Sequence, residues 1–155
     1  VIPVGKKGLV IEKVDGPSHL KVVEEFGYEM YMHCGAIRKV LLAWQTPAFI
    51  DEYFKNIILH DQAFPHVRPD DLREELKKIR QDGYAITHGE YVTDALGIGA
   101  PVFNSDGELA GSIGIIAPEI RVDTPEFLDT QKDLVQFYAS SLSADLGYEK
   151  HDVFQ

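Results

Sequence analysis

The chain has 155 residues, 45% hydrophobic and 26% charged, which predicts a single domain over residues 1–155 that buries its core without disulfides. The single cysteine excludes an intramolecular disulfide and a four-thiolate zinc site. The net charge of −10 argues against nucleic-acid or membrane binding by this domain, and without a long apolar stretch or signal-peptide pattern we expect a cytoplasmic location.

The first part of the chain is predicted to contain two strands followed by three helices. Residues 1–5 are expected to be a loose end, and residues 8–14 and 20–26 to be strands separated by a turn. Helical spacing then runs from Gly35 to about residue 44, and Thr46 followed by proline starts a second helix to about residue 57. Residues 60–69 are expected to be irregular, and a third helix precedes Gly83.

The second part is predicted to contain three strands and one helix. Residues 84–88 form a short strand, and residues 96–103 and 108–117 form a hairpin around an Asp-Gly turn. A final helix begins after Asp123-Thr124 and ends at Gly147. This order predicts an α+β domain in which helices flank an antiparallel sheet of about five to six strands.

Catalytic and metal sites are not expected. Cys34 follows His33 directly, but adjacent side chains point in different directions and do not make a nucleophile–base pair. His88 and Glu90 would share one face of an extended strand, and His33 with Cys34 could approach them in space as a zinc site, yet the six histidines lack the spacing of metal ligands. We therefore expect no metal, no cofactor and no enzyme activity, and treat the histidines as scattered.

Four glycines lie inside the predicted hairpin strands: Gly97, Gly99, Gly111 and Gly114. Glycine weakens a strand, and it often marks the close approach of a ligand or of another backbone. The predicted helix start at Gly35 would supply backbone N–H groups that favour an anion. Two readings stay open, a concave ligand pocket and close packing of a helix on the sheet.

Residues 31–43 (YMHCGAIRKVLLA) resemble a segment of IclR-type transcriptional regulators. Four further segments agree in order, namely a helix ending in IRQDGY, residues 100–107 (APVFNSDG), residues 113–121, and a final helix ending in LGY. The resemblance implies a GAF-like C-terminal effector-binding domain that forms homodimers or homotetramers. It also implies that the family's N-terminal winged helix-turn-helix domain, through which DNA would be bound, is absent from this chain.

The resemblance also implies where an effector would lie. The helix start corresponds to the backbone of Ala36 and Ile37, the family's pocket aspartate to Thr87, a further pocket position to Gly97, and two effector-binding serines to Gly114 and Ile116. Arg38 replaces a glycine of the family's helix motif. The full set of expected ligand-binding residues is Val22, Cys34, Gly35, Ala36, Ile37, Thr87, His88, Gly97, Gly114 and Ile116.

With polar groups missing at three of these positions, we expect a small organic acid, possibly an aromatic one, because Gly97 and Gly114 would leave room for a larger apolar ligand. The alternative is an oligomerisation module whose pocket no longer binds anything. A GAF-like enzyme that uses Cys34, such as a sulfoxide reductase, is the third reading, but it would need a second, resolving thiol.

Overall fold

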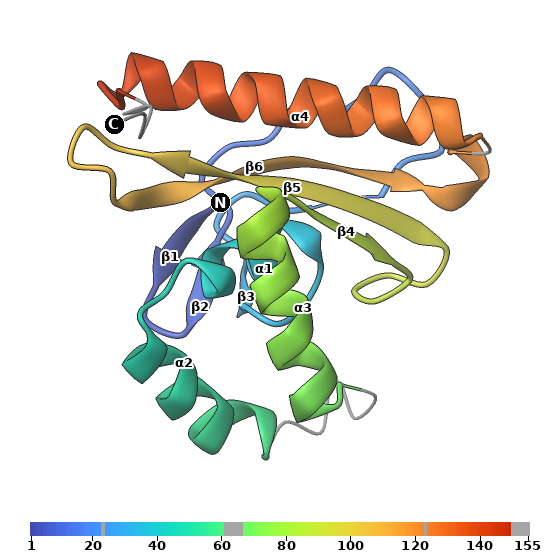
Figure 1. Ribbon diagram of the computed structural model, residues 1–155. Coiled ribbons are helices and arrows are strands. Elements are labelled where there is room, and N and C mark those ends of the chain that lie inside the picture. The colour runs from blue at the N-terminus through green and yellow to red at the C-terminus, as the bar shows by residue number, and fades with distance from the viewer. Residues whose placement is uncertain (23, 61–66, 123, 150–155) are drawn as a thin grey trace.

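The computed structural model describes residues 1–22, 24–60, 67–122 and 124–149. A twisted antiparallel sheet separates two helical layers, as Figure 1 shows. The long C-terminal helix α4 (Pro125–Asp145) lies along one face, and α1 (Ala36–Ala43) and α3 (Pro69–Asp82) lie on the other. This arrangement confirms the expected α+β class.

The C-terminal sheet contains β4 (Ala85–His88), β5 (Ala95–Phe103) and β6 (Leu109–Pro118) in the order β4-β5-β6. The hairpin between β5 and β6 turns where the Asp-Gly pair predicts it, with Gly107 at a φ of 75°. The Asn104 side chain accepts hydrogen bonds from the backbone of Asp106 and of Glu108, each at 3.0 Å, which fixes this turn. The hairpin prediction is therefore confirmed.

The N-terminal sheet contains β1 (Ile2–Val4), β2 (Lys7–Leu9) and β3 (Glu29–Tyr31) in the order β1-β2-β3. Val1 connects the two sheets, since its backbone N and O exchange hydrogen bonds of 2.8 Å with the O and N of Ser112 in β6. The six strands thus form two three-stranded sheets that this pair joins at β6. The expected five to six antiparallel strands are confirmed.

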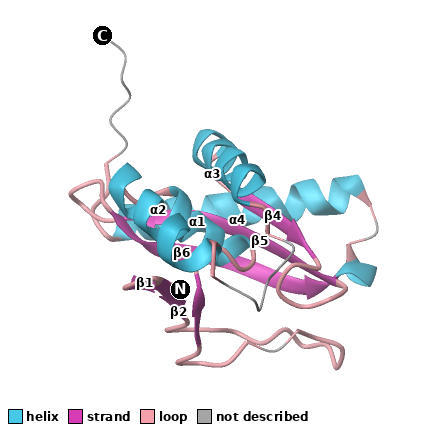
Figure 2. Ribbon diagram, turned by 90° about the horizontal axis from the view of Figure 1, so that it is seen from below, coloured by secondary structure: helices cyan, strands magenta, loops and turns pink. Residues whose placement is uncertain are grey.

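Three sequence predictions fail in this sheet. Residues 2–4 form a strand rather than a loose end, the predicted strand 8–14 ends at Leu9, and residues 20–26 contain no strand in their described part. The physical reason is that β1 occupies one edge of β2 and β3 occupies the other, so residues 20–26 cannot pair with β2. Figure 2 shows the connection from β2 to β3 as a long loop instead. We call it the 11–28 segment.

The helices follow the predicted caps closely. Thr46 and Thr124 accept hydrogen bonds of 3.2 Å from the backbone of Phe49 and Phe127, starting α2 (Pro47–Tyr53) and α4. A π-helical turn, η1 (Phe54–Ile58), continues α2, and a 3₁₀ turn, η2 (Glu119–Arg121), precedes α4. Of the region predicted to be irregular, residues 61–66 lie outside the described residues, as does Asp123.

The core has two parts, one on each side of the sheet. Almost every residue of α1 is buried, and its Val40, Leu41 and Leu42 pack with α3 and the aromatic residues of α2 and η1. The other part lies between β5 and α4, where Ile98, Val102 and Val135 meet. Helix α1 is therefore held firmly, and its first turn is placed against β4 and β5.

Candidate functional site

A small hollow lies where the first turn of α1 meets β4 and β5, and we call it the α1 hollow. Its cavity volume is ≈ 20 Å³, room for about one water molecule. The connection from β4 to β5, which carries Glu90 and Tyr91, borders it. Its walls are residues 35–38, 90–92 and 95–97 together with Thr87 and Ile116.

Gly97 opens the hollow because it lacks a side chain. It lies opposite Thr87 in the register of β4 and β5. A Cβ added at Gly97 would come within 3.0 Å of the Thr87 hydroxyl oxygen and 3.4 Å of the Ala36 Cβ. Any residue larger than glycine at this position would thus fill the space.

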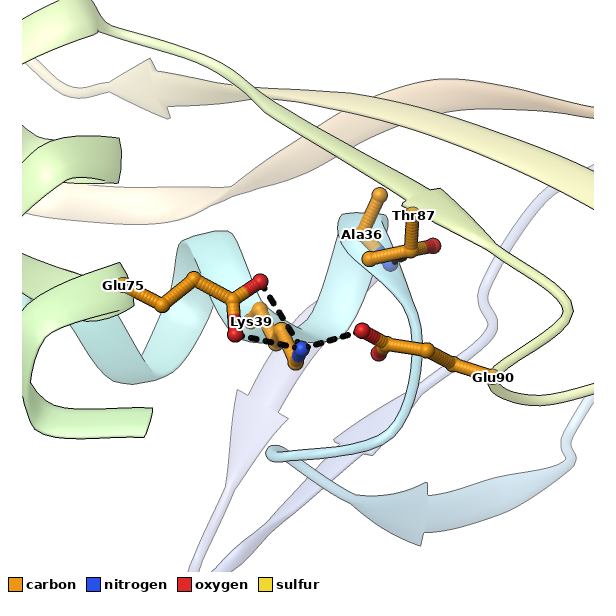
Figure 3. Close-up of polar contacts among 5 residues, drawn as sticks. All are labelled: Ala36, Lys39, Glu75, Thr87 and Glu90. Atoms are coloured by element: carbon orange, nitrogen blue, oxygen red, sulfur yellow. Dashed lines mark hydrogen bonds and ion pairs between the residues drawn. The ribbon is translucent and has the colours of Figure 1, made fainter. Parts of the chain in front are cut away.

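The first N–H group of α1 already has a protein partner. Ala36 N donates to the hydroxyl oxygen of Thr87 at 3.1 Å, and both groups are buried. Figure 3 shows the two residues facing each other at the helix start. Gly35 enters the helix at a φ of 76°, a left-handed conformation that favours glycine. The hydroxyl therefore takes the place that an anion would occupy at this N–H group.

Replacing Thr87 by valine, which has the same shape, is expected to lower the free energy of unfolding by about 1 kcal/mol, because Ala36 N would lose its acceptor. Urea denaturation would measure this change. Thr130→Val, on the exposed surface of α4, is the matched control and should change stability by less than about 0.5 kcal/mol. Equal losses in the two variants would contradict the assigned role of the hydroxyl.

A buried lysine ties the border of the hollow to two helices. The Lys39 side chain is 3% exposed, and its Nζ lies 2.8 and 2.7 Å from the two carboxylate oxygens of Glu75 in α3 and 2.7 Å from Oε1 of Glu90. Figure 3 shows Lys39 between these two carboxylates. Its positive charge is thus fully engaged, and it holds the β4–β5 connection in place beside the hollow.

Arg38 is buried in the wall of the hollow and pairs with the 11–28 segment. Its Nη1 and Nη2 each donate to a carboxylate oxygen of Glu24 at 3.0 Å, and the guanidinium lies 5.2 Å from the ring centre of Tyr91. Burial, and next the negative charge of Glu24, raise the pKa of Tyr91 to about 12. The Tyr91 phenol therefore remains protonated at neutral pH.

The structure brings six of the expected ligand-binding residues to the hollow: Gly35, Ala36, Ile37, Thr87, Gly97 and Ile116. The other four lie outside its walls. His88 points to the surface, 61% exposed, and pairs with Glu119 at 3.0 Å, because neighbouring residues of a strand point to opposite faces. Cys34 is buried just before Gly35, and Val22 is half-buried within the 11–28 segment.

The room expected beside Gly114 is absent. A Cβ at Gly114 would lie 2.6 Å from the Cγ1 of Ile37, and one at Gly99 would lie 2.7 Å from the Ile37 Cα. Gly111 faces the backbone of Val1 in the same way. Of the four strand glycines, Gly97 alone lines the hollow, whereas the other three allow close packing of α1 and the N-terminal strand on the sheet.

Sequence reasoning did not include Arg38, Glu90, Tyr91 and Val92 among the residues of the site. The signal for Arg38 was present, since the family's helix motif has glycine there. Within the described ranges, no group of three or more His, Cys, Asp and Glu residues could hold a metal ion. No described helix is both long and apolar enough to cross a membrane.

The fold is an α+β domain in which the start of α1 meets an antiparallel sheet at a small hollow. The profile of the family described as "Bacterial transcriptional regulator IclR C-terminal" matches residues 2–144. The chain belongs to this family.

Its relatives are transcription regulators rather than enzymes. The HTH-type transcriptional regulator RhmR of Escherichia coli is 30% identical over 90% of this chain and 54% of its own length. KipR of Bacillus subtilis is 26% identical over 93% of this chain and 58% of its own length. The chain thus spans little more than half the length of these relatives.

Solved structures agree with this assignment. The IclR protein of Thermotoga maritima superposes with a TM-score of 0.84 at 28% identity, covering 95% of this chain and 60% of that one. A C-terminal domain of a transcriptional regulator from Vibrio cholerae gives a TM-score of 0.76 at 28% identity, covering 91% and 82%. The second of these was solved as a targeted domain.

Proposed function

We propose that this chain is the effector-binding domain of a DNA-binding transcription regulator, and that its effector is a small organic acid bound at the α1 hollow. The observation that carries the proposal is the space left by Gly97 between Thr87 and the first turn of α1. A buried start of a helix, a hydroxyl and a nearby guanidinium are groups that bind a carboxylate.

The size of the hollow favours a compact acid. A cavity volume of ≈ 20 Å³ holds about one water molecule, so any effector must displace part of the β4–β5 connection. An aromatic acid would have to displace the β4–β5 connection much further than an acid of two or three carbon atoms would. We therefore place compact aliphatic acids before aromatic ones.

The proposed consequence of binding is a change in affinity for DNA. The relatives are named HTH-type regulators, and we propose that DNA is bound by a helix-turn-helix domain outside these 155 residues, in a cytoplasmic homodimer or homotetramer. An effector changes such an equilibrium only through different affinities for its two states. The Lys39–Glu90 contact offers a route, because moving the β4–β5 connection strains a bond to α1 and α3.

Thermal unfolding in the presence of acetate, propionate, pyruvate and benzoate tests the proposal. An acid at about 100 times its Kd adds about 2.7 kcal/mol of stability, which raises the Tm of a chain of this length by about 5–10 °C. We expect the compact acids to raise it and benzoate to act less. If none of them does so at millimolar concentration, the proposal fails.

Gly97→Ala is expected to abolish this stabilisation and leave the chain folded. The new methyl group would occupy the hollow, and its closest contacts are two side chains rather than backbone. Gly16→Ala is the matched control, since no described atom lies within 4 Å of a Cβ at that position. The control should respond to acids as the unmodified chain does, and retained stabilisation in Gly97→Ala would place the ligand elsewhere.

A second candidate is an oligomerisation module without an effector. It is favoured by the small volume of the hollow and by the bond that Thr87 already makes to the helix start. This candidate predicts no Tm shift with any acid and an oligomeric state, measured by sedimentation, that no acid changes. A shift with the unmodified chain that is lost in Gly97→Ala would exclude it.

A further inference from the structure

The Arg38 guanidinium is the most deeply buried positive charge at the α1 hollow. Arg38 is 1% exposed and contributes to the wall of the hollow. Its Nε is buried and has no hydrogen-bond partner among the residues that the structure describes. Buried N–H groups are nearly always paired in native proteins, so the unpaired Nε of this lining residue suggests a partner that reaches it when the β4–β5 connection moves.

Several other donor groups at and beside the hollow are already engaged. Nη1 and Nη2 of Arg38 donate hydrogen bonds to Glu24, and Ala36 N donates one to Thr87. The ammonium group of Lys39 pairs with two carboxylates. The Nε edge of Arg38 combines a positive charge with an unused donor. Guanidinium groups bind a carboxylate more strongly than neutral donors do, because the hydrogen bond is assisted by charge.

We infer that Arg38 is the anion-binding residue of this domain: a carboxylate oxygen of the effector accepts a hydrogen bond from Arg38 Nε, and the rest of the effector extends toward Thr87 and Gly97. This inference rests on the function proposed above and moves the anion subsite from the backbone of the helix start to a side chain. Arg38 stands where the resemblance to IclR-type regulators implies glycine.

The surrounding charges also select the kind of acid. Two cations, Arg38 and Lys39, already face three carboxylates, from Glu24, Glu75 and Glu90. The net charge of this group is −1 before any effector binds, so each carboxylate of the effector adds repulsion, and a second one would be opposed more strongly than the first. The site therefore favours monocarboxylates over dicarboxylates.

The test compares propionate, its neutral analogue propionamide, and the dicarboxylate malonate on the 155-residue chain, with Kd measured by NMR titration. The central variant is Arg38→Met with Glu24→Leu, because replacing both members of a buried ion pair by apolar residues of similar volume is commonly tolerated. The matched control, Arg73→Met with Asp51→Leu, removes an ion pair of 3.0 Å on the surface. Circular dichroism establishes that each variant is folded.

We expect the unmodified chain and the control to bind propionate at least about tenfold more tightly than propionamide or malonate, and the central variant to lose this preference. Arg38→Lys keeps the charge but lacks Nε, and it should also lose most of the preference. This variant replaces the double variant in the test if the double variant does not fold. An unchanged preference in a folded Arg38 variant would overturn the inference and leave the proposed function standing. Absence of binding by the unmodified chain to all three probes would overturn the inference, and it would overturn the proposed function as well if acetate, pyruvate and benzoate also fail to stabilise the chain.

Discussion

Gly99→Ala is expected to lower the free energy of unfolding by about 2–3 kcal/mol. Gly99 and Gly114 lie opposite each other in β5 and β6, and the first turn of α1 rests on this pair. A Cβ at Gly99 would lie 2.7 Å from the Cα and 2.9 Å from the N of Ile37. These are backbone atoms, so α1 itself would have to move.

Urea denaturation followed by circular dichroism measures this loss. Gly16→Ala is the control, because its new methyl group meets no described atom within 4 Å, and its stability should stay within about 0.5 kcal/mol of the unmodified chain. If Gly99→Ala were as stable as the control, the close approach of α1 to β5 would be incorrect. The geometry of the hollow would then have to be revised as well.

Glu24→Ala should cost about 3–5 kcal/mol, since it leaves the Arg38 guanidinium buried without a counter-charge. The side chains of Arg38 and Glu24 are 2% and 14% exposed, so solvent cannot replace the lost carboxylate. Glu24 is also one of the few half-buried residues in the described part of the 11–28 segment, in which Val14 is 94% and Phe26 72% exposed. Loss of this anchor should therefore also expose the segment.

The double variant Arg38→Met with Glu24→Leu separates charge from packing. It should be clearly more stable than Glu24→Ala, because no charge is left buried. Denaturation gives the stability, and trypsin cleavage after Lys13 and Lys21 reports on exposure of the segment. If the double variant were no more stable than Glu24→Ala, the packing of these side chains rather than their charge would hold the segment to α1.

Part of the α1 hollow could be predicted from the sequence. The glycines of the hairpin and the helix start were identified from their positions in the chain, and Thr87 and Gly97 do face each other across β4 and β5. The sequence could not predict which glycine leaves a space, because this depends on the residues that pack against each glycine in the folded chain. Ile37 covers Gly99 and Gly114, whereas Gly97 faces the shorter side chains of Ala36 and Thr87.

The sequence by itself determined the helices, the hairpin and the α+β class, because these depend on local spacing, on capping threonines and on an Asp-Gly turn. Only the tertiary structure decided the pairing of β1, β2 and β3 and the partners of Arg38 and Lys39. The contacts of Arg38 and Lys39 join residues 14 to 51 positions apart, and their free energy exists only once burial has removed the charges from water. The local sequence pattern does not show which buried charged residues will pair with each other.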